Sequence, residues 1–399
     1  MAPVISELER THTPYVFLHA GQHYDFELSQ QFICELGLPE PDIKIHLASR
    51  DPATRIGEMI LGISRAIAAA EVGAVAVVGD TDAVLASAIA ANKQSIEVIH
   101  VEAGLRSYDL RMPEEHNRRL TDHLSGVLFA PTRYNRRTLL GERVSGKVFV
   151  TGNTIIDSVK QYWPLAQKAE SIDVSCERYV LATIHRMENV DSKNVLLEFV
   201  RAFTKAPCRV VLPLHPRTKR RLMEFGLWRK LVRNRSQVKI LEPVGYFQFL
   251  KLMKHSECIL TDSGGVQEEA TSPLVRKRVV VLRTSTDRPE ALKAEFGILA
   301  GCKATVILKQ LNRILKMNEP PPATSPFGDG QAARRICSLL QAGLWPSVTR
   351  KLKRSSTMDI SRSTTAHDLS GLLENKHRSR RFIKHIHVLQ RWQRLRYCE

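Results

Sequence analysis

The segment 72–91 constrains the fold more than any other part of the chain. It opens with an almost uninterrupted apolar run, Val72–Val78, which gives way to Gly79-Asp80-Thr81 and then to an alanine-rich stretch that ends near Ala91. Apolar runs of this length are typical of parallel strands that are buried on both faces. The segment therefore predicts one strand–turn–helix unit of an open parallel sheet.

The same alternation continues through most of the chain. Further strand-like segments lie at 14–20, 43–47, 96–101, 128–132, 148–154, 179–186, 209–216, 238–241, 258–263 and 279–283. Strands alternating with helical periodicity predict right-handed, doubly wound α/β sheets. At 399 residues the chain is too long for one typical core. We therefore expect an N-terminal Rossmann-like domain at 1–155, a C-terminal one at 156–344, and a tail at 345–399.

Composition narrows the class of protein. The seven cysteines are scattered without a Cys-x-x-Cys pair, which argues against zinc ribbons and disulfide frameworks and favours a reducing cytoplasm. The sequence has no run long enough for a membrane span and no signal peptide, so no membrane association is expected. The formal net charge of +18 is high, but much of it lies in the tail.

The tail is basic and rich in serine and threonine. This composition is typical of a disordered extension, in which Phe382–Leu395 can form a basic helix. The alternative is a segment that binds nucleic acid or another acidic surface.

Charged residues gather after the apolar run 96–101. Glu102, Arg106, Glu114 and Arg118 follow it within a short distance. Charged residues at the carboxyl end of such a strand face the crevice where α/β sheets bind ligands, and acids beside fixed cations suit an anionic substrate that exchanges a proton. The alternative is a surface turn with ion pairs. Asp80 has the same two readings, as a helix cap or as a carboxylate in that crevice.

In the second half, a strand-like segment runs into Ser263-Gly264-Gly265 and then a helix. Two glycines and a helix N-terminus allow backbone amides to bind phosphate, although many such turns bind nothing. His185 and His215 each follow a strand, where a histidine is commonly a plain surface residue. No Gly-x-Gly-x-x-Gly follows any strand, so a nicotinamide or flavin cofactor is not expected.

Taken in order, these motifs resemble the non-hydrolysing UDP-N-acetylglucosamine 2-epimerases over about residues 1–340. The matching segments are Gln22-His23, Gly79–Thr81, His100–Arg106, Pro113–Arg118, Thr151–Thr154, His185–Asn189, Thr261–Glu269, Arg288–Glu290 and Ser325–Gly330. The resemblance implies a glycosyltransferase-B-like fold, with two Rossmann-like domains and the active site in the cleft between them. It also implies conversion of UDP-N-acetylglucosamine to UDP-N-acetylmannosamine through 2-acetamidoglucal, a homodimer, and no cofactor or metal.

The resemblance also implies roles for individual residues. Acid and base candidates are Asp80, Glu102 and Glu114, with His185 beside the departing diphosphate. Substrate-binding candidates are Arg118, Phe249, Ser263, Gly264, Gly265, Glu269 and Arg288. Gln22, Arg186 and His215 match positions near a second, allosteric UDP-N-acetylglucosamine site.

Three departures from the family pattern stand out. The chain starts at Met1–Ile5, without the first strand and the Gly-Thr-Arg-Pro-Glu loop that normally precede this segment. We therefore expect a sheet lacking a central strand, and either a true start further upstream or an impaired product. Arg276-Lys277-Arg278 replaces a short turn at a buried strand entry, and the tail has no family counterpart.

The sequence leaves two alternatives to the epimerase. One is a hydrolysing relative that releases N-acetylmannosamine and UDP. The other is a catalytically impaired protein that binds UDP-sugars or, through its tail, nucleic acid.

Overall fold

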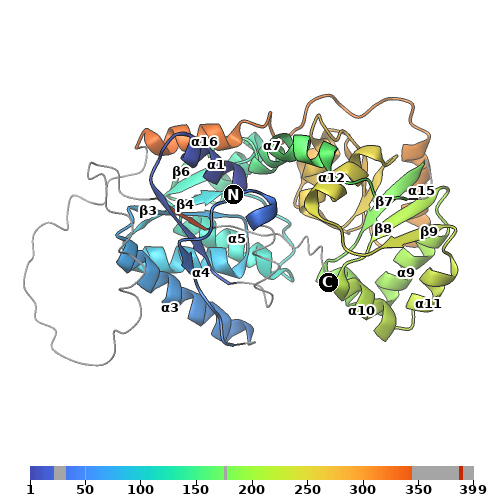
Figure 1. Ribbon diagram of the computed structural model, residues 1–399, viewed down its shortest axis with the longest axis horizontal. Helices are drawn as coiled ribbons and strands as arrows, with labels where there is room; N and C mark the ends of the chain where they lie inside the picture. The colour runs from blue at the N-terminus through green and yellow to red at the C-terminus, as the bar shows by residue number, and fades with distance from the viewer. Residues whose placement is uncertain (22–32, 50, 175–177, 344–385, 390–399) are drawn as a thin grey trace, which may run out of the picture.

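The computed structural model describes residues 1–21, 33–49, 51–174, 178–343 and 386–389. They form two α/β lobes side by side, each built on a parallel sheet with helices against both faces (Figure 1). The chain passes from one lobe to the other at α7 (Thr154–Lys168). The predicted pair of doubly wound Rossmann-like domains in a glycosyltransferase-B-like arrangement is confirmed.

The N-terminal sheet has seven strands within the described part of the chain, in the order β2-β1-β13-β3-β4-β5-β6. Their bounds are β1 (Tyr15–His19), β2 (Ile43–Lys44), β3 (Ala74–Val78), β4 (Glu97–Val101), β5 (Val127–Ala130), β6 (Lys147–Val150) and β13 (Ile386–Leu389). All five residues of β3 are buried, as its continuous apolar run predicted. β2 lies at the sheet edge, where a short strand was expected.

Figure 1 shows α3, α4 and α5 on one side of the N-terminal sheet, and α1 and α16 on the other. The helices of this lobe are α1 (Ala2–Arg10), α3 (Pro52–Ala70), α4 (Asp82–Lys93), α5 (Pro113–Leu124), α6 (Arg133–Gly141) and, returning from the end of the second half, α16 (Ala332–Gln341). The backbone amides of Ala332 and Ala333 donate to the carboxylate of Asp157 on α7, over 3.1 and 2.8 Å, which secures the return of α16.

The centre of this sheet differs from expectation. Instead of a missing strand, β13 from the tail lies parallel between β1 and β3, and the register places Val388 beside both Phe17 and Ala76. The four described tail residues are thus in a strand, not in the helix expected over Phe382–Leu395. Both neighbouring strands therefore have a ladder partner at this position.

The C-terminal sheet has six strands among the described residues, in the order β12-β11-β10-β7-β8-β9. They are β7 (Tyr179–Thr183), β8 (Arg209–Pro213), β9 (Val238–Leu241), β10 (Ile259–Thr261), β11 (Val279–Val281) and β12 (Gly297–Leu299). The helices are α8 (Met187–Val190), α9 (Lys193–Thr204), α10 (Pro216–Glu224), α11 (Trp228–Arg233), α12 (Tyr246–His255), α13 (Gly264–Thr271), α14 (Pro289–Lys293) and α15 (Ala304–Leu315).

The two lobes share an apolar seam near α7. The ring of Tyr162 on α7 packs edge-on against Tyr246 of α12, with ring centroids 6.4 Å apart. The Tyr162 hydroxyl donates to the carbonyl of Leu36 over 3.0 Å. This contact ties both lobes to one helix and so positions the faces that meet across the cleft.

None of the helices in the described residues is long and apolar enough to cross a membrane. Within the same residues no cluster of histidine, cysteine, aspartate and glutamate has an arrangement suited to a metal ion.

Candidate active site

Two sharp turns follow β3 and β4 and carry the first two candidate carboxylates. Gly79 and Gly104 adopt left-handed φ angles of 82° and 83°, which glycine reaches without strain. Glu102 also has a positive φ of 69°, an uncommon conformation for a residue with a side chain. Such strain is found mostly where the surrounding structure fixes a functional residue.

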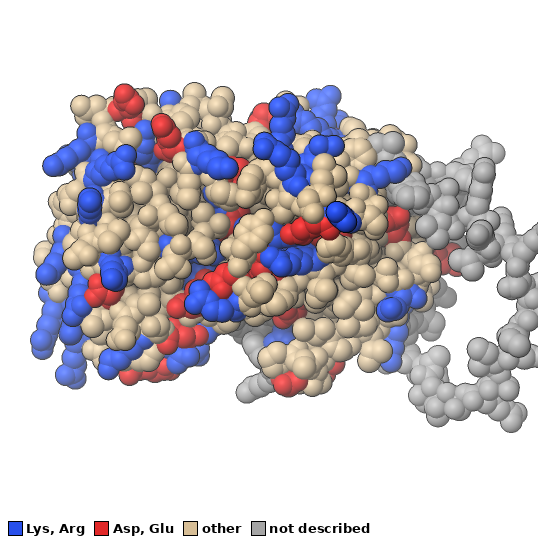
Figure 2. Space-filling model, turned by 180° about the vertical axis from the view of Figure 1, so that it is seen from behind, with Lys and Arg blue, Asp and Glu red and all other residues tan. Residues whose placement is uncertain are grey.

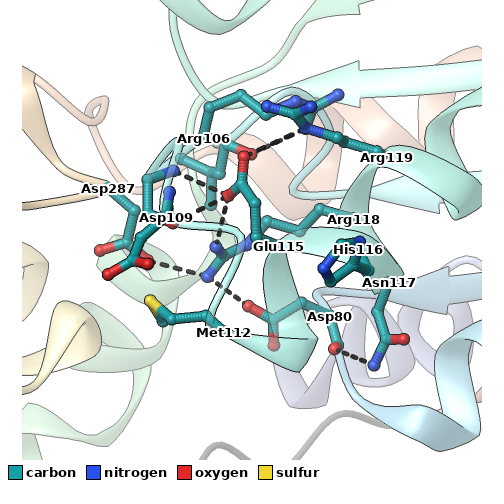
Figure 3. Close-up of polar contacts among 12 residues, drawn as sticks. Asp80, Arg106, Asp109, Met112, Glu115, His116, Asn117, Arg118, Arg119 and Asp287 are labelled. Carbon is teal, nitrogen blue, oxygen red and sulfur yellow. Dashed lines mark hydrogen bonds and ion pairs between the residues drawn. The ribbon is translucent and has the colours of Figure 1, made fainter. Parts of the chain in front are cut away.

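Asp80 lies at the end of β3 and is paired with Arg118. An oxygen of its carboxylate lies 2.5 Å from the Arg118 guanidinium, and both side chains are only 2 % exposed. The Asn117 side chain donates to the Asp80 carbonyl over 3.0 Å. Because Asn117 and Arg118 are neighbours on α5, this one helix holds both the backbone and the side chain of Asp80 (Figure 3).

Arg118 also contacts the other lobe. Its guanidinium donates to Asp287, which precedes α14, over 2.8 Å, and to Glu115 on its own helix over 3.3 Å. Figure 3 shows Arg118 between Asp80 and Asp287, with Glu115 completing its acidic surroundings. The arginine is therefore a bridge across the cleft.

A second cross-lobe contact joins Glu102 to Arg288. The Arg288 guanidinium lies 3.0 Å from the Glu102 carboxylate, 2.6 Å from Glu268 on α13 and 2.9 Å from Asp287. Since Arg118 and Arg288 share Asp287, a continuous chain of ion pairs runs from Asp80 through the C-terminal lobe to Glu102. The two carboxylates that the sequence singled out thus lie in one connected site.

The Ser263 turn lies next to this chain. Ser263 caps α13, accepting a hydrogen bond from the amide of Val266 over 3.4 Å. A Cβ atom added to Gly264 would lie 3.4 Å from the guanidinium carbon of Arg288 and 3.4 Å from Asp287 Oδ1. A Cβ at this position would make ordinary van der Waals contact, so the turn lies directly against the Arg288–Asp287 pair.

Buried charges in the site have shifted pKa values. Burial by itself would raise the pKa of Asp287, but the guanidiniums of Arg288, Arg283 and Arg118 hold it well below its ordinary value. Burial raises the pKa of Glu268 above its ordinary value, although the adjacent Arg288 offsets part of this rise. Asp287 therefore carries a permanent negative charge at neutral pH.

Glu269, the candidate ribose ligand, is fully buried on α13, and this burial raises its pKa to about 7. The neighbouring Tyr246 offsets part of this rise. A carboxyl group with this pKa is present in both protonation states near neutral pH.

His185 follows β7 and is fixed through its backbone. Its amide donates to the buried carboxylate of Asp262 over 3.1 Å, as does the amide of Arg186. The Asn189 side chain donates to the same carboxylate over 3.0 Å. The ring of His215 lies 6.0 Å from the ring of His185, centroid to centroid. Two of the three expected allosteric residues thus lie beside His185.

The remaining predicted site residues are Glu114, Phe249 and Gln22. Glu114 is half-buried in the first turn of α5. Phe249 is fully buried in the apolar core of α12. Gln22 lies outside the described residues, so its expected position is not tested.

Three functional contacts were not expected from the sequence. Asp287 and Glu268 stand next to predicted residues, and Glu115 lies within the matching segment Pro113–Arg118, but none of the three was given a role from the sequence. The signal that was available for Asp287 is its place between Thr286 and Arg288, at the start of a helix that follows a strand.

The surface between the lobes is strongly charged. Figure 2 shows acidic and basic side chains alternating along the middle of the face seen from behind, where the two lobes meet. This face therefore presents cations that an anionic ligand can contact only in competition with the neighbouring carboxylates.

Comparison with known proteins identifies relatives of this chain. Residues 6–341 match the family model described as UDP-N-acetylglucosamine 2-epimerase. The UDP-N-acetylglucosamine 2-epimerase of Methanocaldococcus jannaschii is 40% identical over 357 residues, 86% of this chain and 95% of that protein. UDP-2,3-diacetamido-2,3-dideoxy-D-glucuronate 2-epimerase from Pseudomonas aeruginosa is 35% identical over 349 residues, 85% of this chain and 95% of that protein.

Solved structures agree. The M. jannaschii enzyme in complex with UDP-GlcNAc and UDP has a TM-score of 0.78 at 40% identity, covering 86% of this chain and 96% of that one. The Neisseria meningitidis enzyme bound to UDP-GlcNAc has a TM-score of 0.75 at 32% identity, with the same coverage of 86% and 96%. With its fold, its motifs and these relatives in agreement, the chain belongs to the UDP-N-acetylglucosamine 2-epimerase family.

Proposed function

We propose that this protein interconverts UDP-N-acetylglucosamine and UDP-N-acetylmannosamine by eliminating and re-adding UDP. One observation carries the proposal: the ion-pair chain from Asp80 to Glu102 passes beside the Ser263 turn, where a helix N-terminus is suited to phosphate. Carboxylates for proton transfer and cations for a diphosphate therefore occupy one site.

The chemistry requires both parts. In the first step the C2 proton passes to a carboxylate, a double bond forms between C1 and C2, and the anomeric C–O bond breaks with its electrons leaving on UDP. In the second step a proton from an acid reaches C2 from the opposite face, the C1–C2 double bond is lost, and an oxygen of UDP bonds to C1 again. Transfer on both faces needs more than one acid or base, which Asp80, Glu102 and Glu114 provide.

The ion pairs have a role in this scheme. In the structure Arg118 holds Asp80 and Arg288 holds Glu102. A bound diphosphate gives both arginines a competing anion, which frees the carboxylates for proton transfer. Ser263, Gly264 and Gly265 supply the remaining contacts to the diphosphate, and His185 lies beside it.

The test is a product analysis in D2O. Purified protein is incubated with UDP-N-acetylglucosamine, and NMR follows the sugar products. We expect UDP-N-acetylmannosamine with deuterium at C2, and at least a hundredfold loss of turnover in Asp80→Asn and Glu102→Gln with the fold intact. Full turnover in both variants contradicts these roles.

The same experiment separates the alternatives. Free N-acetylmannosamine with UDP identifies a hydrolysing enzyme, whereas UDP binding without turnover identifies an impaired one. The Pseudomonas relative acts on a diacetamido uronic acid derivative of the UDP-sugar, so this compound is the informative competing substrate.

The finer features of the proposal follow the family resemblance. We expect the protein to be cytoplasmic and to form a homodimer, whose mass light scattering can measure. We also expect Arg186 and His215 to lie near a second UDP-N-acetylglucosamine site, and binding at this site to make the kinetics sigmoidal. A role of the tail in nucleic-acid binding predicts RNA binding that disappears when residues 345–399 are removed.

A further inference from the structure

His100 is a buried histidine that the reaction scheme leaves without a role. It lies in the middle of β4, and its side chain is completely buried. Nδ1 lies 2.6 Å from Oδ1 of Asp122, and Nε2 lies 2.8 Å from the carbonyl oxygen of Gly79. Both partners belong to elements that carry or support the candidate carboxylates.

Both ring nitrogens face groups that accept hydrogen bonds. A backbone carbonyl has no hydrogen to donate, and an ionised carboxylate has none either. A neutral imidazole carries a hydrogen on only one nitrogen, so it would leave one of these short contacts without a hydrogen. Two acceptors at hydrogen-bond distance therefore require two ring hydrogens.

Ion pairs surround the ring on its Asp122 side. Asp122 is fully buried and also lies 2.7 Å from the Arg106 guanidinium, which in turn lies 2.6 Å from Glu142. The neighbouring residues in the sheet, Val77 on β3 and Leu128 on β5, are apolar. The side chain of Glu142 is 26% exposed, so water screens part of its charge, whereas His100, Asp122 and Arg106 are completely buried.

The same contacts reach both catalytic turns. Through Nε2 the ring holds the Gly79 carbonyl, directly before Asp80. The second oxygen of Asp122 accepts the amide of Gly104 over 3.2 Å, two residues beyond Glu102. One His–Asp pair therefore fastens the turns after β3 and β4 to each other and to α5.

We propose that His100 is a positioning residue that donates from both ring nitrogens and, with Asp122, sets the separation and orientation of Asp80 and Glu102. Glu102 needs such support because its backbone φ of 69° is strained and persists only if the surroundings hold it. The positioning role rests on the proposed function, whereas the protonation state does not.

The first test is NMR of the full-length protein with 15N-labelled histidine. We expect one histidine whose two ring nitrogens both carry a hydrogen. The signal is assigned by its absence in His100→Gln, or by slow solvent exchange of its ring hydrogens should that variant not fold. Observation of one unprotonated ring nitrogen at His100 overturns the proposed pair of donated hydrogen bonds.

The second test is kinetic. His100→Gln has one donor nitrogen where the ring has two, so it can hold only one of the two acceptors, and we expect kcat to fall at least tenfold while KM for UDP-N-acetylglucosamine stays within about twofold. Deuterium uptake at C2 should slow by the same factor as turnover. His123→Gln, an exposed histidine on the same helix as Asp122, is the matched control and should keep wild-type kinetics.

The outcomes separate the claims. A folded His100→Gln protein with wild-type kcat overturns the positioning role, even if its stability is reduced. An inactive wild-type protein contradicts the proposed function but leaves the NMR result, and hence the protonation state, to be decided on its own.

Discussion

The guanidinium of Arg288 lies 3.0 Å from the carboxylate of Glu102, although 186 positions separate the two residues in the chain. The contact joins a strand end of the N-terminal lobe to the start of α14 in the C-terminal lobe. Each lobe therefore supplies some of the charged side chains in this chain of ion pairs, and their charges are compensated by side chains of the other lobe.

Replacement of Asp287 by asparagine should be strongly destabilising. The change leaves Arg118, Arg283 and Arg288 without their shared buried anion, and removal of one partner of a buried ion pair costs about 3 kcal/mol or more. Urea denaturation measures the loss. Asp109→Asn breaks the ion pair with Arg111, whose side chain is 81% exposed, and should cost less than about 1 kcal/mol.

The pH dependence of that effect has a defined sign. The pKa of Asp287 is held well below its ordinary value of 3.8. Its stabilising contribution is thus complete above this value and is lost as the pH falls through the lower, folded-state pKa. Wild-type protein should lose stability in acid more steeply than Asp287→Asn, and parallel acid unfolding curves would count against the assignment.

Glu269 predicts the opposite trend. Its pKa is raised from 4.5 to about 7 by burial, so the folded protein holds this proton more tightly than the unfolded chain does. Stability should therefore fall as the pH rises from about 4.5 to about 7, by up to about 3 kcal/mol. Glu269→Gln should flatten this part of the profile. Glu242→Gln changes a carboxylate that is 80% exposed and should leave the profile as it is.

Gly104→Ala should destabilise the protein and impair turnover. The residue has φ +83°, and an added Cβ would lie 2.6 Å from the carbonyl oxygen of Asn135. Strain and overpacking together cost about 2 kcal/mol or more. Gly57, inside α3, has no atom within 4 Å of its added Cβ, so Gly57→Ala should instead stabilise by about 0.5–1 kcal/mol. Thermal unfolding of the two variants distinguishes a requirement for glycine at position 104 from a general effect of the added methyl group.

Removal of residues 386–399 should weaken the N-terminal lobe. It takes away β13 and with it the ladder partners of β1 and β3 on their facing sides. Lost backbone hydrogen bonds cost about 1 kcal/mol each, and more where the groups stay buried. Amide hydrogen exchange should become faster in β1 and β3. Removal of 390–399 alone keeps the strand and should leave exchange there unchanged.

The parts of the fold that the sequence predicted are those set by local pattern. β3 and β10 were predictable because each is a short apolar run that ends at glycine or at an Asp-Ser-Gly-Gly turn. The pairing of Asp287 across the lobes was not predictable, since its partner there, Arg118, lies 169 positions away and no local pattern indicates such a pair.

Two further features depended on distant chain segments. The basic run Arg276–Arg278 looked foreign to a strand entry, yet Arg276 and Arg278 donate to carbonyl oxygens of residues 319–322, which come close only in the folded lobe. Likewise Ile386–Leu389 is too short for its period to separate strand from helix. Its conformation is set by the two strands that it joins.

The position of β13 also bears on the order of assembly. Phe17 and Ala76 pair with Val388 on a strand that is synthesised after all the other strands described in either sheet. The amino-terminal lobe therefore cannot complete its sheet before the later half, whose strands come from one contiguous stretch, has been synthesised. The lobe that is synthesised first therefore completes its sheet last, because its closing strand pairs with strands that are distant in the sequence, and such long-range pairing is slow.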